Sequence, residues 1–303
     1  MNTIFPQGYA WIDGNFLPLA EAKIPILDWG FLRSDATYDV VHVWKGRFFQ
    51  LDKHIDRFFE STKKLRMPCN IDRNELKKIL AGCVKKANLD NAYVEMIQTR
   101  GVSPNFSRDP RLATPRLMAF AVPFGWILKE EDFEKGLDVL LTNIQRISPS
   151  SVDPTIKNYH WMDLVTGMLN AYEKGNDTAI LVDEQNNITE GPGFNLFCVD
   201  ETGIFTPEYG VLEGITRQTV FDLAIELDIS IHKKPISIEK LKNAKEIFAT
   251  STAGGIMPIT KINGQKINNG MVGSITRKIH QLYWLKHYDQ DWSISIEEII
   301  RNS

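Results

Sequence analysis

Short alternating runs of hydrophobic and polar residues open the chain and predict two β-hairpins. The expected strand pairs are Tyr9–Ile12 with Asn15–Leu19 and Thr37–Trp44 with Arg47–Leu51, joined by Asp13-Gly14 and Lys45-Gly46. A two-residue turn that contains glycine, between two alternating runs, is the usual sequence signal of a tight hairpin. We therefore expect the N-terminal region to begin with antiparallel strands.

A helical period replaces the alternation after residue 51. Apolar residues from Ile55 to Leu65 recur at helical spacing behind Asp52, and a second set from Leu76 to Ala87 follows Asp72. An aspartate at the start of a helix can accept hydrogen bonds from its free amides, so we expect Asp52 and Asp72 to be N-caps. Strands at Ala92–Thr99 and Arg116–Val122 would complete an α/β unit.

The second half of the chain predicts many short strands with helices between them. A segment rich in proline, tryptophan and charge runs from Pro123 to Gly136 and favours a linker at 124–131. The strands expected beyond it are Leu137–Ile144, Thr178–Val182, Phe194–Val199, Ile204–Thr206 and Glu246–Ala249, and the helices are His160–Lys174, Thr216–Leu227 and Val272–His287. This order predicts an α+β protein with a small α/β domain at 1–123 and a larger, barrel-like domain at 132–303.

Composition excludes several classes of protein. The 303 residues include 35 Lys+Arg and 38 Asp+Glu, so the net charge of −3 lacks the basic footprint of a nucleic-acid binder. No apolar run approaches the roughly 18–20 residues of a membrane helix, and the N-terminus lacks the features of a signal peptide. Cys69, Cys83 and Cys198 are odd in number and widely spaced, which suits a reducing compartment and gives no metal-binding pattern. We expect a cytoplasmic protein without a metal.

Four features could carry chemistry, but none is specific by itself. Leu212–Arg217 leads into a helix whose first amides could bind an anion, and Thr250–Gly255 offers a second cluster of amides and hydroxyls. Lys157 is either a Schiff-base nucleophile or an ordinary surface charge. Glu190 is either a turn carboxylate or the partner of a protonated ring nitrogen. The residues alone leave these alternatives open.

Taken in order, the segments resemble the fold-type IV enzymes that use pyridoxal 5'-phosphate (PLP). The matching segments are LDKHIDRFFES at 51–61, IKNYHWMDLV at 156–165, TEGPGFNLF at 189–197, LEGITR at 212–217 and TSTAGGIMPIT at 250–260. The resemblance spans about residues 8–288, nearly the whole chain. The blocks around Lys157 and Gly254, with YWLKHYD near the C-terminus, most resemble the (R)-selective amine transaminases. The resemblance implies a two-domain fold and a homodimer whose active site lies at the interface.

The resemblance also implies roles for individual residues. Lys157 would bind PLP as a Schiff base and shuttle protons, and Glu190 would keep the pyridine nitrogen protonated. The other cofactor-binding residues it implies are Arg57, Phe194, Asn195, Leu212, Ile215, Thr216 and Thr252. The substrate-binding residues it implies are Arg33, Tyr38, Val40, Tyr93, Arg108, Trp161 and Ala253.

Two departures from the family patterns bear on the substrate. The segment after Thr99-Arg100-Gly101 lacks the arginine and histidine with which D-amino-acid transaminases bind a carboxylate, whereas Arg108 matches a loop arginine of the amine transaminases. Arg33 replaces a histidine that amine transaminases commonly have. We expect Arg108 to bind the keto-acid carboxylate, with Arg111 as the alternative and Arg33 as a second anchor.

The reaction implied is a ping-pong transamination from an (R)-amine or D-amino acid to a keto acid such as pyruvate. Branched-chain L-amino-acid transamination is the main alternative, and a lyase similar to aminodeoxychorismate lyase is another. A binding protein without catalytic activity would not need both Lys157 and Glu190.

Overall fold

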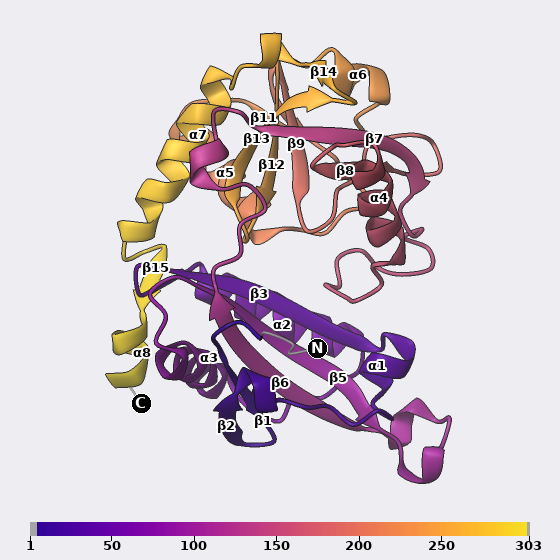
Figure 1. The fold of residues 1–303 in the computed structure, drawn as a ribbon, viewed down its shortest axis with the longest axis vertical. Coiled ribbons are helices and arrows are strands. Elements are labelled where there is room, and N and C mark those ends of the chain that lie inside the picture. The colour runs from indigo at the N-terminus through magenta and orange to yellow at the C-terminus, as the bar shows by residue number, and fades with distance from the viewer. Residues whose placement is uncertain (1–4, 302–303) are drawn as a thin grey trace. The chain divides into compact units, whose positions relative to one another are not determined.

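The computed structural model describes residues 5–301, which form two compact units (Figure 1). Unit 1 comprises residues 5–125, 156–160 and 287–301, and unit 2 comprises residues 126–155 and 161–286. Neither unit is continuous in sequence, whereas the expected division placed all of 132–303 in one domain. The C-terminal segment joins unit 1 because its strand β15 pairs with β4.

Unit 1 is built on a seven-stranded antiparallel sheet in the order β15-β4-β3-β5-β6-β1-β2. The strands are β1 (Tyr9–Ile12), β2 (Asn15–Pro18), β3 (Ala36–Trp44), β4 (Arg47–Phe49), β5 (Ala92–Val102), β6 (Thr114–Pro123) and β15 (Ser293–Ser295). Both predicted hairpins are confirmed. Asp13 and Gly14 both have positive φ, as do Lys45 and Gly46, which is the backbone that a tight hairpin turn requires.

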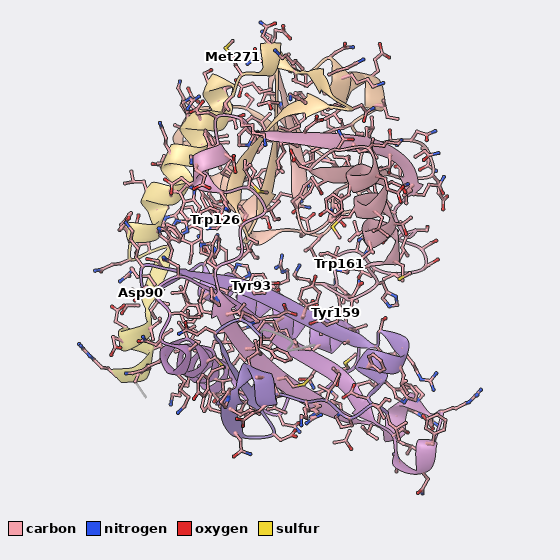
Figure 2. All side chains as sticks on the ribbon, in the orientation of Figure 1. Asp90, Tyr93, Trp126, Tyr159, Trp161 and Met271 are labelled. Carbon is pink, nitrogen blue, oxygen red and sulfur yellow. The ribbon has the colours of Figure 1, made fainter. Side chains whose placement is uncertain are left out.

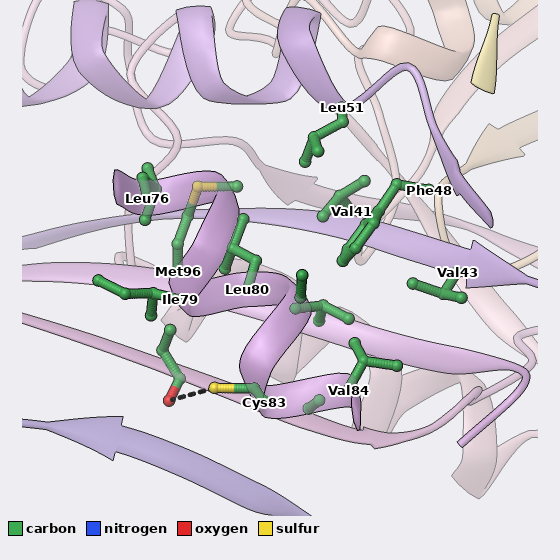
Figure 3. Packing of buried hydrophobic residues seen from close by; sticks show 14 of the residues in the cluster. Val41, Val43, Phe48, Leu51, Leu76, Ile79, Leu80, Cys83, Val84 and Met96 are labelled. Atoms are coloured by element: carbon green, nitrogen blue, oxygen red, sulfur yellow. Dashed lines mark hydrogen bonds between the residues drawn. The ribbon is translucent and has the colours of Figure 1, made fainter. Parts of the chain in front are cut away.

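Helices pack on one face of this sheet and form the core of unit 1 with it (Figure 3). They are α2 (Leu51–Lys64), α3 (Arg73–Ala87) and α8 (Ile296–Arg301). Helix α1 (Trp29–Arg33) lies instead against the Thr99 side chain of β5. The 3-10 turns are at Leu19–Glu21, Pro104–Phe106, Pro110–Leu112 and Lys286–Tyr288. Val41 and Val43 of β3, with Val94 and Met96 of β5, meet Leu80 and other apolar side chains of α3. Burial of such side chains is the main stabilising contribution to the unit.

One of the two expected caps is confirmed. Asp72 accepts a hydrogen bond from the Glu75 amide at 2.8 Å and caps α3. The prediction for Asp52 is wrong, because α2 begins at Leu51 behind Gln50 and Asp52 lies in the first turn. The Gln50 amide donates to the Trp292 carbonyl oxygen at 2.8 Å, which fixes the chain two residues before the expected cap.

Unit 2 contains an eight-stranded mixed sheet that curls around its own core. Its order is β11-β10-β9-β12-β13-β7-β8, with β14 paired to β13. The strands are β7 (Leu137–Gln145), β8 (Thr178–Val182), β9 (Asn195–Asp200), β10 (Gly203–Thr206), β11 (Ile231–Lys233), β12 (Glu246–Ser251), β13 (Gly255–Ile262) and β14 (Gln265–Lys266). The prediction of a two-domain α+β protein with a barrel-like domain is therefore confirmed.

The helices of unit 2 cover the sheet from two sides. They are α4 (Met162–Glu173), α5 (Ile215–Glu226), α6 (Ile238–Lys242) and α7 (Ser274–Leu285), with 3-10 turns at Glu130–Asp132 and Asn268–Gly270. Helix α4 packs on β7 and β8, while α5 and α7 pack together against β12 and β13. In residues 5–301, no helix is long and apolar enough to cross a membrane.

Candidate active site

Strand register places three of the expected substrate residues on one face of the unit 1 sheet. Strands β3 and β5 pair with Val40 opposite Glu95 and His42 opposite Tyr93. Opposed residues, and residues two apart on one strand, point to the same side of a sheet. Tyr38, Val40, Tyr93 and Glu95 therefore share a face, which we call the tyrosine face. The intervening residues point to the other face, which α2 and α3 cover.

Lys157 is attached to the tyrosine face by its backbone and by its side chain. Its carbonyl oxygen accepts hydrogen bonds from the Tyr38 amide at 3.1 Å and from the Thr37 hydroxyl at 2.6 Å. Its Nζ lies 4.5 Å from the centroid of the Tyr38 ring. An ammonium group at this distance is attracted by the negative face of an aromatic ring. The expected nucleophile is thus held in register with β3.

Two tyrosine hydroxyls converge on Glu95. Tyr159 stacks on Tyr38 with a centroid separation of 4.3 Å and donates to Glu95 Oε1, and Tyr93 donates to Oε2 at 3.0 Å. Figure 2 labels both of these tyrosines. Glu95 is only 7% exposed. Burial raises the pKa of Glu95 above its ordinary value, and the tyrosine hydrogen bonds and the charge of Lys157 offset part of that rise.

Arg57 lies on the helix-covered face, where it is paired with a buried aspartate. Its guanidinium donates to Asp39 Oδ2 at 2.7 Å and to Oδ1 at 2.9 Å, and His54 Nδ1 lies 2.8 Å from Oδ1. Asp39 is completely buried. Burial alone would raise the pKa of Asp39, but the charge of Arg57 and the hydrogen bonds of His54 and Arg57 outweigh it and hold the pKa below its ordinary value.

The three arginines considered for substrate binding lie in exposed positions. Arg33 ends α1 with its guanidinium carbon 4.4 Å from the centroid of the Trp29 ring. Arg108 lies in the loop between β5 and β6. Arg111, in the same loop, makes a bidentate ion pair with Asp109. The structure thus gives Arg111 a local partner within its own loop.

Unit 2 places Glu190 at the centre of a second network. Arg146 donates to Glu190 Oε1 from Nε at 3.1 Å and from Nη2 at 2.9 Å, and it also pairs with Asp163. Glu190 Oε2 accepts a hydrogen bond from the Leu212 backbone amide at 3.0 Å and lies 3.4 Å from the side-chain nitrogen Nδ2 of Asn195. These donors fix the carboxylate in one orientation.

The turn after Leu212 leads into the uncapped start of α5. Gly214 is the N-cap and contributes no side chain, so the first amides of Ile215 and Thr216 have no side-chain cap. A Cβ on Gly214 would come within 2.1 Å of Asn195 Oδ1, so only glycine fits there. The buried Arg217 holds the turn through Glu213, Thr206 and the Pro207 carbonyl oxygen.

A second turn, between β12 and β13, carries the remaining expected residues of unit 2. Thr252 and Ala253 are half-buried there, and the Ser251 hydroxyl bridges the Ala253 amide and the Gly193 carbonyl oxygen. Trp161 is half-buried at the start of α4, and an added Cβ on Gly193 would lie 3.6 Å from its ring. The Phe194 side chain instead packs into the core of unit 2.

Comparison with known proteins identifies the family. The sequence pattern of the family described as Amino-transferase class IV matches residues 36–262. The chain belongs to this family. It is an aminotransferase with the fold-type IV architecture, and PLP is its cofactor.

Named relatives are similar along nearly the whole chain. A protein of Methanocaldococcus jannaschii called "Putative branched-chain-amino-acid aminotransferase" is 30% identical over 94% of this chain and 98% of its own length. The branched-chain-amino-acid aminotransferase of Escherichia coli (strain K12) is 28% identical over 91% of this chain and 92% of its own.

Solved structures give the same result for the fold. The branched-chain aminotransferase of Thermoproteus uzoniensis superposes with a TM-score of 0.87 at 27% identity, covering 95% of this chain and 99% of that one. The T.th. branched-chain enzyme, solved with pyridoxamine 5'-phosphate, gives a TM-score of 0.89 at 25% identity, covering 96% and 99%. These names fit the branched-chain alternative better than the expected preference for (R)-amines or D-amino acids.

The residues of this aminotransferase fit PLP. The uncapped amides at the start of α5 suit a phosphate group, because a helix N-terminus favours negative charge. Among residues 5–301, the buried Thr250 hydroxyl, opposite Asn195 in the sheet, has no hydrogen-bond partner and is available to a bound group. The fixed Glu190 carboxylate suits a protonated ring nitrogen.

Sequence reasoning missed several residues that orient the expected ones. These are Asp39 and His54 beside Arg57, Glu95 and Tyr159 beside Lys157, and Arg146, Asp163 and Arg217 in unit 2. Asp39 is a charged residue within the otherwise apolar segment TYDVV, and this contrast could have identified it. No local pattern indicates Arg146, because it lies 44 residues from Glu190.

Proposed function

We propose that this aminotransferase transfers the amino group of branched-chain L-amino acids to a 2-oxo acid, and that it acts as a cytoplasmic homodimer. The supporting observation is the tyrosine face, where Tyr38, Val40 and Tyr93 present aromatic and aliphatic side chains around the segment that holds Lys157. Such a wall suits an aliphatic substrate side chain, because burial of apolar surface favours binding. The names of the relatives support the same choice.

The roles proposed for individual residues follow the family resemblance. Lys157 would hold PLP and move the transferred proton at Nζ, and Glu190 would keep a proton on the ring nitrogen. The phosphate contacts are Arg57, the Ile215 and Thr216 amides and the Thr252 hydroxyl, and Leu212 and Asn195 complete the cofactor contacts. Trp161 and Ala253 of unit 2 are also proposed to bind the substrate. When bound, PLP supplies an electron sink for the substrate carbanion.

A panel of amino donors tests the function. L-leucine, L-isoleucine and L-valine, with 2-oxo acids as acceptors, should be transaminated faster than their D-enantiomers or (R)-1-phenylethylamine. Chiral analysis of the remaining donor identifies the enantiomer used. Consumption of the D-enantiomers or the amine alone would contradict the branched-chain assignment. Release of pyruvate from aminodeoxychorismate without any amino acceptor would indicate the lyase instead.

The covalent site is tested without reference to activity. Borohydride reduction followed by peptide mapping should find the pyridoxyl group on Lys157, and a label on another lysine would overturn the assignment.

Glu190→Gln should retain PLP but slow proton abstraction about 100-fold or more, because a neutral amide supports a protonated ring nitrogen poorly. A wild-type rate in this variant would remove the role given to Glu190.

A second candidate, transamination of (R)-amines or D-amino acids, is favoured by the segments IKNYHWMDLV and YWLKHYD and by the exposed loop arginine Arg108. An arginine on a loop can bind the acceptor carboxylate and withdraw from an apolar amine. Arg108→Ala should then raise the KM for pyruvate about 10- to 100-fold while sparing the half-reaction with the amine, since a charge-assisted contact contributes about 1.5–3 kcal/mol. An unchanged KM for pyruvate in Arg108→Ala would exclude this role for Arg108. If only Arg33→Ala raised that KM, the role would belong to Arg33.

A further inference from the structure

Glu95 is an acid set among aromatic and aliphatic side chains on the tyrosine face. It lies directly opposite Val40 of β3 on one side and opposite Phe120 of β6 on the other. Residues two positions away on its own strand are Tyr93 and Ile97, which point to the same side. A carboxyl group at the centre of this wall therefore faces the same space as the side chains proposed to contact the substrate.

The hydrogen bonds around Glu95 favour its charged form. Both oxygens accept, Oε1 from the Tyr159 hydroxyl and Oε2 from the Tyr93 hydroxyl. A protonated carboxyl would have to donate from one of these oxygens, where a tyrosine hydroxyl already donates. The wall thus carries a negative charge that the two tyrosines hold in place.

We propose that Glu95 sets the substrate class of the enzyme by excluding acids with a second carboxylate on the side chain, and that the amino acceptor is a monocarboxylate 2-oxo acid. This inference rests on the proposed function and deepens it. A substrate side chain that ends in a carboxylate would place a second negative charge against Glu95 in a desolvated wall. At the effective dielectric of such sites, like charges about 6 Å apart reduce binding about 10- to 100-fold. An aliphatic side chain meets no such repulsion.

Two ligands of the same shape isolate the charge. Glutarate and its monoamide, glutaramate, differ only in whether the far end is charged, and their binding to the holoenzyme can be followed by the absorbance of bound PLP. We expect the wild-type enzyme to bind glutaramate at least about tenfold more tightly than glutarate. Equal affinities would overturn the proposal without any variant.

Variants then assign the effect to Glu95. Glu95→Gln should bring the two affinities to within about threefold and raise kcat/KM for 2-oxoglutarate relative to 4-methyl-2-oxopentanoate at least about tenfold. Tyr159→Phe removes one hydrogen bond but keeps the charge, so it should retain the discrimination even where activity falls. An unchanged affinity ratio in Glu95→Gln would overturn the proposal. If that variant does not fold, Glu95→Asp must retain the discrimination, and its loss there would overturn the proposal equally.

These results separate the inference from the function on which it rests. Failure to transaminate any branched-chain L-amino acid would remove the proposed function, while the glutarate and glutaramate affinities would still report on Glu95. Efficient transamination of branched-chain donors with equal use of 2-oxoglutarate by the wild-type and Glu95→Gln enzymes would remove the inference alone.

Discussion

The two faces of the unit 1 sheet each bury an acid, and the two acids differ in the partners that hold them. Asp39, on the helix-covered face, accepts from the Arg57 guanidinium and pairs with His54. Glu95, on the tyrosine face, accepts from the neutral hydroxyls of Tyr93 and Tyr159. The pKa of Asp39 is lowered and that of Glu95 is raised, although burial raises both. Burial acts on both acids in the same direction, so the difference between their pKa values comes from their partners.

Unit 2 contains an acid that is held in the same way as Asp39. Glu190 is fixed by Arg146 as Asp39 is fixed by Arg57, and in both pairs the guanidinium donates two hydrogen bonds. Bidentate pairing of this kind fixes the orientation of a carboxylate. Glu95 lacks it, which is consistent with a carboxylate that acts on the substrate rather than one that anchors a cation.

The largest expected effect comes from breaking the charged pair. Arg57→Ala leaves Asp39 buried without its main counter-charge, so we expect the free energy of unfolding to fall by about 3–5 kcal/mol. Urea titration of the apoenzyme measures this, and PLP retention should fall as well. Arg57→Lys is the matched control, since it keeps the charge and should recover part of the loss. A loss below about 1 kcal/mol would show that Asp39 and Arg57 are not coupled.

The neutral partners of Glu95 should matter less. Tyr159→Phe removes one hydrogen bond to a carboxylate, which we expect to cost about 1.5–3 kcal/mol of stability. Tyr172→Phe serves as the control, because its exposed hydroxyl has only a 3.9 Å contact with the Met168 sulfur. Equal stability of the two variants in the same titration would mean that the hydrogen bond to Glu95 does not contribute to the free energy of unfolding.

The pH dependence of stability should separate the two acids. The pKa of Asp39 in the folded protein lies below the ordinary value of 3.8, so its stabilising contribution is present above about pH 4 and is lost as the pH falls further. The pKa of Glu95 lies above its ordinary value of 4.5, so its contribution has the opposite sign and stability falls as the pH rises through that window.

Substitution of each acid tests these signs. Asp39→Asn should flatten the acid side of the stability profile, and Glu95→Gln should flatten the fall above pH 4.5, each by no more than about 1.4 kcal/mol per pH unit. Urea titrations between about pH 3 and 8 provide the profiles. If both variants changed the same side of the stability profile, the opposite signs assigned to Asp39 and Glu95 would be wrong.

The smallest effect is expected at the exposed end of α1. Arg33 lies over the Trp29 ring, and removal of this contact in Arg33→Ala should lower stability by about 0.5–1 kcal/mol. Thermal unfolding detects a change of this size. A much larger loss would show that Arg33 has a structural partner beyond Trp29.

Much of the local structure could be predicted from the sequence. The hairpin turns at Asp13-Gly14 and Lys45-Gly46 and the cap at Asp72 follow from interactions between residues only a few positions apart. Strand β13 was not predicted, because Gly255–Ile262 is buried along almost all of its length and shows no alternation. The five ordered segments also identified the fold-type IV family and its PLP cofactor, while the preference for (R)-amines that they suggested is not supported by the names of the relatives.

The sequence by itself therefore determined the short-range elements, the family and the candidate residues Lys157, Glu190 and Arg57. Only the tertiary structure decided which side chains meet. The β3–β5 register places Glu95 opposite Val40. Arg146 meets Glu190 in the folded unit 2, and the C-terminal strand β15 pairs with β4 of unit 1. A local pattern records the period of one element, whereas these contacts arise between elements far apart in the chain. The choice among them depends on which pairing buries apolar surface while satisfying every buried charge.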